Sequence, residues 1–271
     1  MQYRRVLTIA GSDSGGGAGI QADIKTISAH GCYAASAITA ITVQNTLGVS
    51  AVHPVPAEVV EQQIYAVLSD IGADAIKIGM LHSAAVVQCV CRQLDQFAIP
   101  DVVLDPVMVS TSGRRLLDPE AIALLRHELM PRARVITPNI PEAEVLLDGA
   151  PIDSPDQMAE AAHTLAEQLH TSVLLKGGHL TDSQLVDILY DAEQGKVHQL
   201  PSLRISTRNT HGTGCTLSSA LASQLALGKS LPDAVAAAKQ YIDAAILAAV
   251  PYQIGQGTGP VHHFYNQTYP K

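Results

Sequence analysis

Short apolar runs recur along the chain, and each one ends in a group of glycine, proline or small polar residues. Apolar runs of this length that are rich in β-branched residues are typical of buried strands. The first run ends in a Ser/Gly-rich turn, and the second ends at Gln44 and Asn45. The predicted strands span residues 5–11, 34–43, 74–80, 102–107, 134–137 and 173–175.

Between these runs the apolar residues follow a helical spacing. After Pro56, for example, an apolar stripe continues to Ile71. Asp118-Pro119-Glu120 and Ser154-Pro155-Asp156 each place a capping side chain before a proline, which is a helix start signal. The predicted helices span residues 19–29, 56–71, 83–97, a segment from 118, 141–147, 154–170, 216–227 and 232–250.

Strands and helices therefore alternate, and such repeats form a mostly parallel sheet with helices on both faces. Residues 185–190 and 196–205 instead alternate apolar and polar positions, and they predict an antiparallel pair at a sheet edge. No linker-like or low-complexity segment interrupts the pattern. We predict a single α/β domain over residues 1–271.

Polar clusters occur where the predicted parallel strands end. Sheets of this class bind ligands outside the carboxyl ends of their strands, so we expect these clusters to meet at one edge. Turns also attract glycine, proline, asparagine and aspartate, but so many clusters at the same end of successive strands favour a binding site. The clusters are residues 11–13, 44–45, 79–80, 105–107, 137–139 and 176–178.

Composition narrows the function. Hydrophobic residues make up 47% of the chain, and the formal net charge is -8 with no block of Lys and Arg. This balance argues against a nucleic-acid or anionic-membrane partner. No apolar stretch reaches the roughly 20 residues that cross a bilayer, and the run near the N-terminus is too short for a signal peptide. We expect a cytoplasmic enzyme.

The cysteines are Cys32, Cys89, Cys91 and Cys215. In the cytoplasm they should be reduced. Cys89 and Cys91 lie two positions apart in a predicted helix, so their side chains diverge and do not share a metal. No His/Cys group has the spacing of a zinc site.

Two nucleotide motifs fit poorly. Residues 17–22 match G-x-G-x-x-A, but the turn before them is long and no acid lies between Asp23 and Glu58 to hold a ribose. Gly228-Lys229-Ser230 lacks the first glycine of a P-loop, because Ser223 stands there, and it follows a helix rather than a strand.

The stronger phosphate site is residues 210–216, Thr-His-Gly-Thr-Gly-Cys-Thr, which opens an Ala/Ser-rich helix. Its glycines allow consecutive backbone N–H groups to face an anion, and the helix N-terminus adds its dipole. Cys215 would lie in the first turn, where the pKa of a thiol tends to fall. The same pattern also fits a glycine-rich turn before a packed helix.

Several segments together are similar to the hydroxymethylpyrimidine/phosphomethylpyrimidine kinases of thiamin biosynthesis. They extend from the first strand almost to the C-terminus. One departure is Ser14-Gly15, where many members have Pro-Ser, and it makes that loop looser. The matching segments are residues 10–13, 16–23, 43–46, 77–81, 105–108, 137–139, 142–143, 176–179, 209–216 and 259–264.

The resemblance implies a ribokinase-like fold that transfers the γ-phosphoryl group of MgATP to the hydroxymethyl group of 4-amino-5-hydroxymethyl-2-methylpyrimidine, and then phosphorylates the monophosphate. At the acceptor end, Gln44 would pair with the ring's amino edge, because an amide offers both a donor and an acceptor. The other implied substrate-binding residues are Gly11, Ala18, Asp23, Met80 and Val107.

At the nucleotide end, the resemblance implies that Asn139 and Glu142 serve magnesium and phosphate through water, and that Lys176 reaches the nucleotide phosphates. Asp105 is a second candidate metal ligand. The residues from Gly212 through Thr213 and Gly214 to Cys215 would form the anion hole. Cys215 stands where sugar kinases of this fold carry an aspartate base, so we expect it to act as the base, although it can also contribute its amide alone.

Two other functions compete. A pyridoxal kinase shares the fold and the cysteine-containing loop, but Gln44 and Met80 favour the pyrimidine. A catalytically silent binding protein would not need Lys176, Glu142 and the glycine loop. Apolar residues near 49–52 and the family resemblance also indicate a homodimer.

Overall fold

A computed structural model describes residues 3–108, 117, 119–149, 151–178 and 184–267 of the chain. Within these residues the strands form one nine-stranded sheet of order β3-β2-β1-β4-β5-β6-β7-β8-β9. The strands are β1 (Arg5–Asp13), β2 (Tyr33–Asn45), β3 (Gly48–Pro54), β4 (Ala75–Ile78), β5 (Val102–Leu104), β6 (Val135–Ile136), β7 (Ser172–Leu175), β8 (Gln184–Asp191) and β9 (Lys196–Leu203).

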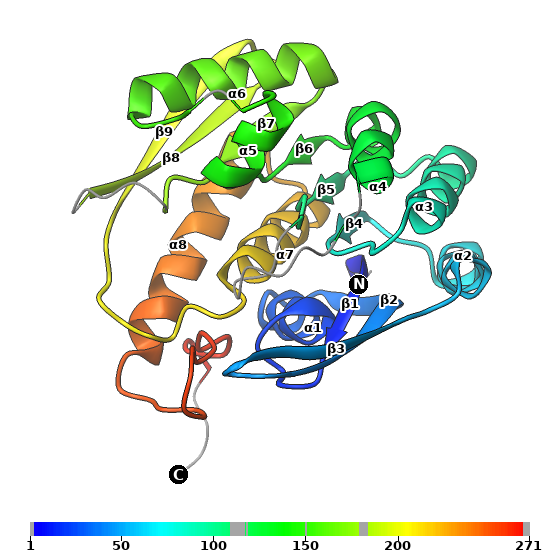
Figure 1. Ribbon diagram of the computed structural model, residues 1–271, viewed down its shortest axis with the longest axis horizontal. Helices are drawn as coiled ribbons and strands as arrows, with labels where there is room; N and C mark the ends of the chain where they lie inside the picture. Colours follow the sequence, from blue (N-terminus) through cyan, green and yellow to red (C-terminus); the bar gives the residue numbers. More distant parts are fainter. Residues whose placement is uncertain (1–2, 109–116, 118, 150, 179–183, 268–271) are drawn as a thin grey trace.

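The helices occupy both faces of the sheet (Figure 1). They are α1 (Gly19–Ala29), α2 (Ala57–Ala66) with the π-helical turn η1 (Val67–Ile71), α3 (Ala84–Phe97), α4 (Pro119–Leu124) with η2 (Leu125–Leu129) and η3 (Met130–Arg132), α5 (Ile140–Leu146), α6 (Pro155–Leu169), α7 (Thr213–Ala226) and α8 (Leu231–Ala249). The predicted fold class is therefore confirmed.

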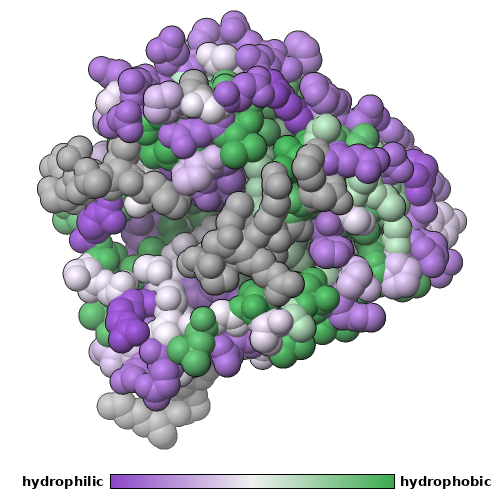
Figure 2. Space-filling model, viewed as in Figure 1, coloured by the Kyte–Doolittle hydropathy of each residue, from purple (hydrophilic) through white to green (hydrophobic). Residues whose placement is uncertain are grey.

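Two apolar cores attach these layers to the sheet. Helices α2 to α6 cover one face, where Ile64, Val87 and Leu165 are fully buried. Helices α1, α7 and α8 cover the other, with Ile27 and Leu221 at its centre. Burying each such side chain contributes about 1.5–3 kcal/mol. The outer side of α6 is hydrophilic, as Figure 2 shows at the top of that view.

Strands β2, β1, β4, β5, β6 and β7 run parallel. The antiparallel pair β8–β9 beside β7 is confirmed. The opposite edge is antiparallel as well, because β3 folds back on β2. The carboxyl ends of the parallel strands all lie on the same side of the sheet, and the predicted polar clusters follow these strand ends.

Several boundaries differ from the prediction. β5 ends at Leu104 and β6 at Ile136, shortly before Pro106 and Pro138, whose nitrogens cannot donate to a ladder. α7 begins at Thr213, so the glycine loop forms its first turn. The predicted helix start at Asp118 and the motif residue His179 lie outside the described residues.

Candidate active site

The loop between β1 and α1 is organised around the carboxylate of Asp13. Its Oδ1 accepts the backbone N–H of Gly15 at 2.7 Å, and its Oδ2 accepts those of Gly17 and Ala18 at 3.1 and 2.8 Å. Burial alone would raise the pKa of Asp13, but hydrogen bonds from His211, Ala18 and Gly15 outweigh it and hold the pKa below its usual value. The loop that carries Ala18 is thus fixed by an ionised side chain.

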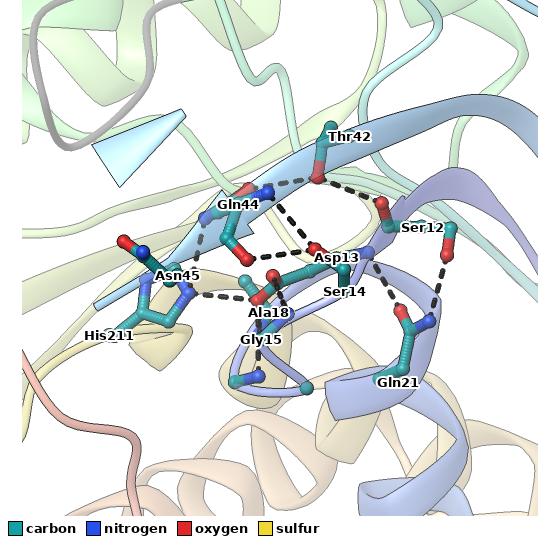
Figure 3. A network of polar contacts seen from close by, with 12 residues as sticks. Ser12, Asp13, Ser14, Gly15, Ala18, Gln21, Thr42, Gln44, Asn45 and His211 are labelled. Carbon is teal, nitrogen blue, oxygen red and sulfur yellow. Dashed lines mark hydrogen bonds and ion pairs between the residues drawn. The ribbon is translucent and has the colours of Figure 1, made fainter. Parts of the chain in front are cut away.

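Gln44 and His211 lie against this loop (Figure 3). His211 Nε2 is 2.9 Å from Asp13 Oδ2 and 3.2 Å from Gln44 Nε2. Thr42 Oγ1 lies 3.1 Å from Gln44 Oε1. The predicted reader of the substrate edge is therefore held from two sides, by the loop before α7 and by its own strand.

Two further predicted substrate residues are in contact. Gly11 packs on Met80, because an added Cβ at Gly11 would lie 2.5 Å from Met80 Cε. Met80 belongs to the segment after β4, and its carbonyl oxygen accepts a hydrogen bond from Thr39 Oγ1 at 2.6 Å. Val107 is half-buried after β5, and its N–H donates to the Asp105 carbonyl oxygen at 2.8 Å.

The loop before α7 approaches the β1–α1 loop closely. Gly212 is the N-cap of α7 and has a φ of 80°. An added Cβ there would overlap the carbonyl oxygen of Gly17, so both the conformation and the contact require glycine. Thr213, Gly214 and Cys215 follow as the first turn of α7, and the N–H groups at a helix N-terminus favour an anion.

A lysine and two acids lie beside this turn. Lys176 Nζ donates to Asp105 Oδ1 at 2.9 Å, and the side chains of Lys176 and Asp105 are 16% and 3% exposed. An added Cβ at Gly214 would lie 3.4 Å from Asp105 Oδ2 and 3.5 Å from Lys176 Nζ, so the pair adjoins the first turn of α7. Burial lowers the pKa of Lys176, but Asp105 and Glu142 raise it by more, so the net pKa is raised and the ammonium stays charged.

Glu142 and Asn139 form a capping box at the start of α5. Asn139 Oδ1 accepts the Glu142 N–H at 2.9 Å, and Glu142 Oε2 accepts the Asn139 N–H at 2.8 Å. Burial raises the pKa of Glu142 to about 7, against the lowering effect of Lys176, and the nearby Asp105 raises it further. The positive charge near Glu142 is therefore too small to offset the effect of burial on its carboxylate.

This donor set fits magnesium. Mg²⁺ is usually bound by one or two carboxylates together with water and substrate phosphates. Asp105 and Glu142 supply such carboxylates, and an added cation would stabilise the Glu142 carboxylate and lower its pKa. Among the described residues, no group of three or more His, Cys, Asp or Glu side chains converges as an all-protein metal cage.

The expectation of a lowered pKa for Cys215 is wrong. Burial raises the pKa of its thiol to about 11, and Asp23 and Asp105 raise it as well, while Lys77 and a hydrogen bond from the Gly19 N–H lower it. Burial therefore outweighs the effects of Lys77 and Gly19. The thiolate is therefore scarce near neutral pH.

The placement of Asp23 in the substrate pocket also needs correction. Asp23 is fully buried and forms an ion pair with Lys77. The Lys77 ammonium donates to Oδ1 and Oδ2 of Asp23 at 2.9 and 3.0 Å. Thr8 Oγ1 and Ser219 Oγ donate to it at 2.6 and 2.7 Å. A carboxylate with all of these partners and no exposed surface does not contact a ligand. Asp23 instead holds β1, β4 and α7 together through Thr8, Lys77 and Ser219.

The family model described as phosphomethylpyrimidine kinase matches residues 13–262. This chain belongs to that family. A hydroxymethylpyrimidine/phosphomethylpyrimidine kinase of Rhizobium meliloti is 51% identical over 259 residues, which cover 96% of each chain.

Solved structures agree. A phosphomethylpyrimidine kinase from Clostridium difficile is 45% identical with a TM-score of 0.79, over 90% of this chain and 99% of that one. A pyridoxal kinase from Staphylococcus aureus in complex with AMP-PCP and pyridoxal is 33% identical with a TM-score of 0.86, over 97% of this chain and 95% of that one.

Three polar residues in or next to the site were not predicted from the sequence. His211 was named only within the predicted phosphate loop, Asp13 only within the polar cluster after the first strand, and Lys77 only within a matching segment. The usable signal for His211 was a titratable side chain directly before the Gly-Thr-Gly turn. Lys77 gave no signal, because its partner Asp23 lies far away in the sequence.

Proposed function

We propose that this protein is an ATP-dependent kinase that phosphorylates 4-amino-5-hydroxymethyl-2-methylpyrimidine and then its monophosphate. The family assignment supports this reaction. The observation that carries it furthest is the Lys176–Asp105 pair against the first turn of α7, with the undercompensated Glu142 beside it. Such an arrangement can neutralise the charge of a transferring phosphoryl group, which is the main requirement of this chemistry.

The residues at the nucleotide end have different roles in this proposal. Lys176 binds and orients the nucleotide phosphates, and the N–H groups from Gly212 to Cys215 stabilise charge on the transferring group. Asp105 and Glu142 would hold magnesium, which when bound neutralises phosphate charge. Asn139 keeps Glu142 in place through the capping box.

The acceptor alcohol would lie at the other end, between Gln44 and the β1–α1 loop. Gln44 offers the amide that matches an aminopyrimidine edge, and Gly11, Ala18, Met80 and Val107 surround the ring. The contacts around Asp13 and His211 join this end to the anion hole, because Gly212 touches Gly17.

Cys215 contributes mainly its backbone N–H in this proposal. A thiol with a pKa of about 11 is rarely ionised near pH 7 and is therefore a poor general base in the resting enzyme. In a loose phosphoryl-transfer transition state the alcohol proton leaves late, so a strong base is not needed early.

A comparison of three phosphoryl acceptors tests the proposed substrate. Specificity constants with MgATP should be highest for hydroxymethylpyrimidine and its monophosphate, and much lower for pyridoxal, whose ring offers no amino edge to Gln44. Gln44→Leu should weaken use of the pyrimidine by about 1–3 kcal/mol, the cost of an unpaired polar edge. If pyridoxal is the better substrate, the assignment is overturned.

We also propose a homodimer and a cytoplasmic location. On β2 and the turn after it, Ile41, Val43 and Leu47 are 49%, 57% and 72% exposed, which is an unusual apolar surface for an isolated chain. A second copy of this chain would cover it by two-fold pairing. The cysteines are free, and of the described helices none is long and apolar enough to span a membrane. Light scattering of a Val43→Lys variant checks the dimer.

A further inference from the structure

The carboxamide of Gln44 lies between two hydrogen-bonding neighbours (Figure 3). Thr42 Oγ1 is 3.1 Å from one end of it, and His211 Nε2 is 3.2 Å from the other. In the structure the oxygen faces Thr42 and the nitrogen faces His211. The two ends of a carboxamide have the same shape, so the hydrogen-bond requirements of its neighbours determine which end is oxygen.

The neighbour on one side is a donor. His211 Nε2 lies 2.9 Å from Asp13 Oδ2, and an ionised carboxylate only accepts hydrogen bonds. His211 Nε2 must therefore carry a hydrogen in this contact. An amide NH₂ group facing the same nitrogen would oppose hydrogen to hydrogen. The amide oxygen, in contrast, would accept a share of that N–H.

The neighbour on the other side is an acceptor. Thr42 Oγ1 lies 2.9 Å from the carbonyl oxygen of Ser12, which has no hydrogen to give. A hydroxyl group has a single hydrogen, and the shorter contact of Thr42, 2.9 Å to Ser12 against 3.1 Å to Gln44, assigns it to Ser12. Toward Gln44, Thr42 therefore presents a lone pair, which requires the amide nitrogen. Both neighbours therefore favour the amide oxygen toward His211 and the amide nitrogen toward Thr42.

We propose that Asp13, acting through His211, and Ser12, acting through Thr42, fix the Gln44 amide with its oxygen toward His211 and its nitrogen toward Thr42. His211 and Thr42 are then positioning residues that set the order of acceptor and donor along the substrate-facing edge. This inference rests on the proposed function, because it specifies how that edge distinguishes an aminopyrimidine from its 4-oxo counterpart. The amino compound offers a donor followed by an acceptor, whereas the oxo compound offers the reverse.

The surrounding structure keeps His211 in place. An added Cβ at Gly17 would lie 2.5 Å from the imidazole Cδ2, so the ring packs directly on that backbone. The His211 N–H donates to the Gly259 carbonyl oxygen at 2.9 Å, which holds its main chain against the C-terminal segment. Its side chain is only 13% exposed. The ring therefore has little freedom to turn away from Asp13.

The test is a ratio of two specificity constants, measured with MgATP. The substrates are 4-amino-5-hydroxymethyl-2-methylpyrimidine and 5-hydroxymethyl-2-methylpyrimidin-4-one. The proteins are the wild type, His211→Phe, Thr42→Val and the double variant, with exposed His127→Phe as a matched control. The wild type should prefer the amino compound by about 10²-fold, because the reversed edge leaves buried polar groups unpaired.

Each single variant should reduce this preference by about tenfold, and the double variant should reduce it further, because the amide is then free to turn. His127→Phe should keep the wild-type ratio. If both single variants lose activity equally on both substrates, His211 and Thr42 are merely structural and the inference is overturned. If the wild type does not phosphorylate the amino compound, the proposed function fails, and the inference fails with it.

Discussion

Two lysine–aspartate pairs contact the first turns of α7, and they differ in what surrounds them. Lys77 and Asp23 are fully buried, and Asp23 has additional donors in Thr8 and Ser219. Lys176 is partly exposed and pairs with Asp105, and the pKa of the neighbouring Glu142 is raised to about 7. A completely satisfied pair stabilises the fold, whereas a pair beside an undercompensated acid is ready to bind a ligand.

The closed pair should give the largest effect, and it should be on stability. Lys77→Met leaves Asp23 buried without its cation, so the free energy of unfolding should fall by about 3–5 kcal/mol. Denaturant titration measures this loss, and the exposed Lys196→Met variant is its control. A loss below about 1 kcal/mol, as for a surface pair, would show that the pair is not structural.

The open pair should give the next largest effect, and it should be on turnover. Lys176→Gln removes charge that faces the transferring phosphoryl group, so kcat should fall by about 10²–10³-fold. Its loss of stability should be smaller than that of Lys77→Met. The distinction between the pairs breaks down if Lys176→Gln unfolds the protein more readily than Lys77→Met does.

Glu142→Gln should have a moderate effect with a clear pH signature. Because the pKa of Glu142 is raised to about 7 from 4.5, the folded protein retains a proton that the unfolded chain releases between these pH values. Stability of the wild type should therefore decline as pH rises through this window. The glutamine variant keeps the capping box and should lack this part of the decline.

Unfolding titrations without magnesium at several pH values measure the difference between Glu142→Gln and the wild type. The variant should gain relative stability from pH 4.5 to 7. It should also need more magnesium for turnover, with pyrimidine binding nearly unchanged. A collapse of pyrimidine affinity at unchanged magnesium dependence would place Glu142 at the wrong end of the cleft.

Cys215 should give the smallest effect. Cys215→Ala keeps the backbone N–H, so turnover should stay within about threefold of the wild type, whereas loss of a general base costs about 10²–10⁴-fold. Because the pKa of the thiol is raised to about 11, alkylation should accelerate by about tenfold per pH unit from neutral to alkaline pH without a plateau. A plateau near pH 7 would restore the base role.

These two pairs also show what the sequence could predict. α1 was predicted at Gly19–Ala29, because Gly31 and the apolar spacing are local signals. Lys176 was found for the same reason, since it ends a strand beside glycines. Lys77 and Asp23 lie on different elements, and only folding brings them together. The orientation of Gln44 depends in the same way on His211, which is distant in the sequence.

The predicted ends of helices and strands were wrong where the backbone properties of proline and glycine outweigh the pattern of apolar side chains. Strand β5 was predicted to continue to Val107, but Pro106 cannot donate to the ladder. α7 was predicted from Thr216, because glycines suggest a loop, yet Gly212 is the N-cap and Thr213 begins the helix. The fall in the pKa of Cys215 was wrong because burial and neighbouring acids are tertiary effects.

The most direct test of the account is a ³¹P NMR time course with MgATP and 4-amino-5-hydroxymethyl-2-methylpyrimidine. We predict that the γ-phosphoryl group appears first in the pyrimidine monophosphate and then in the diphosphate, and that Lys176→Gln slows both steps. Lys77→Met protein that remains folded should still carry out both. Release of inorganic phosphate alone, with no phosphorylated pyrimidine, would contradict the account.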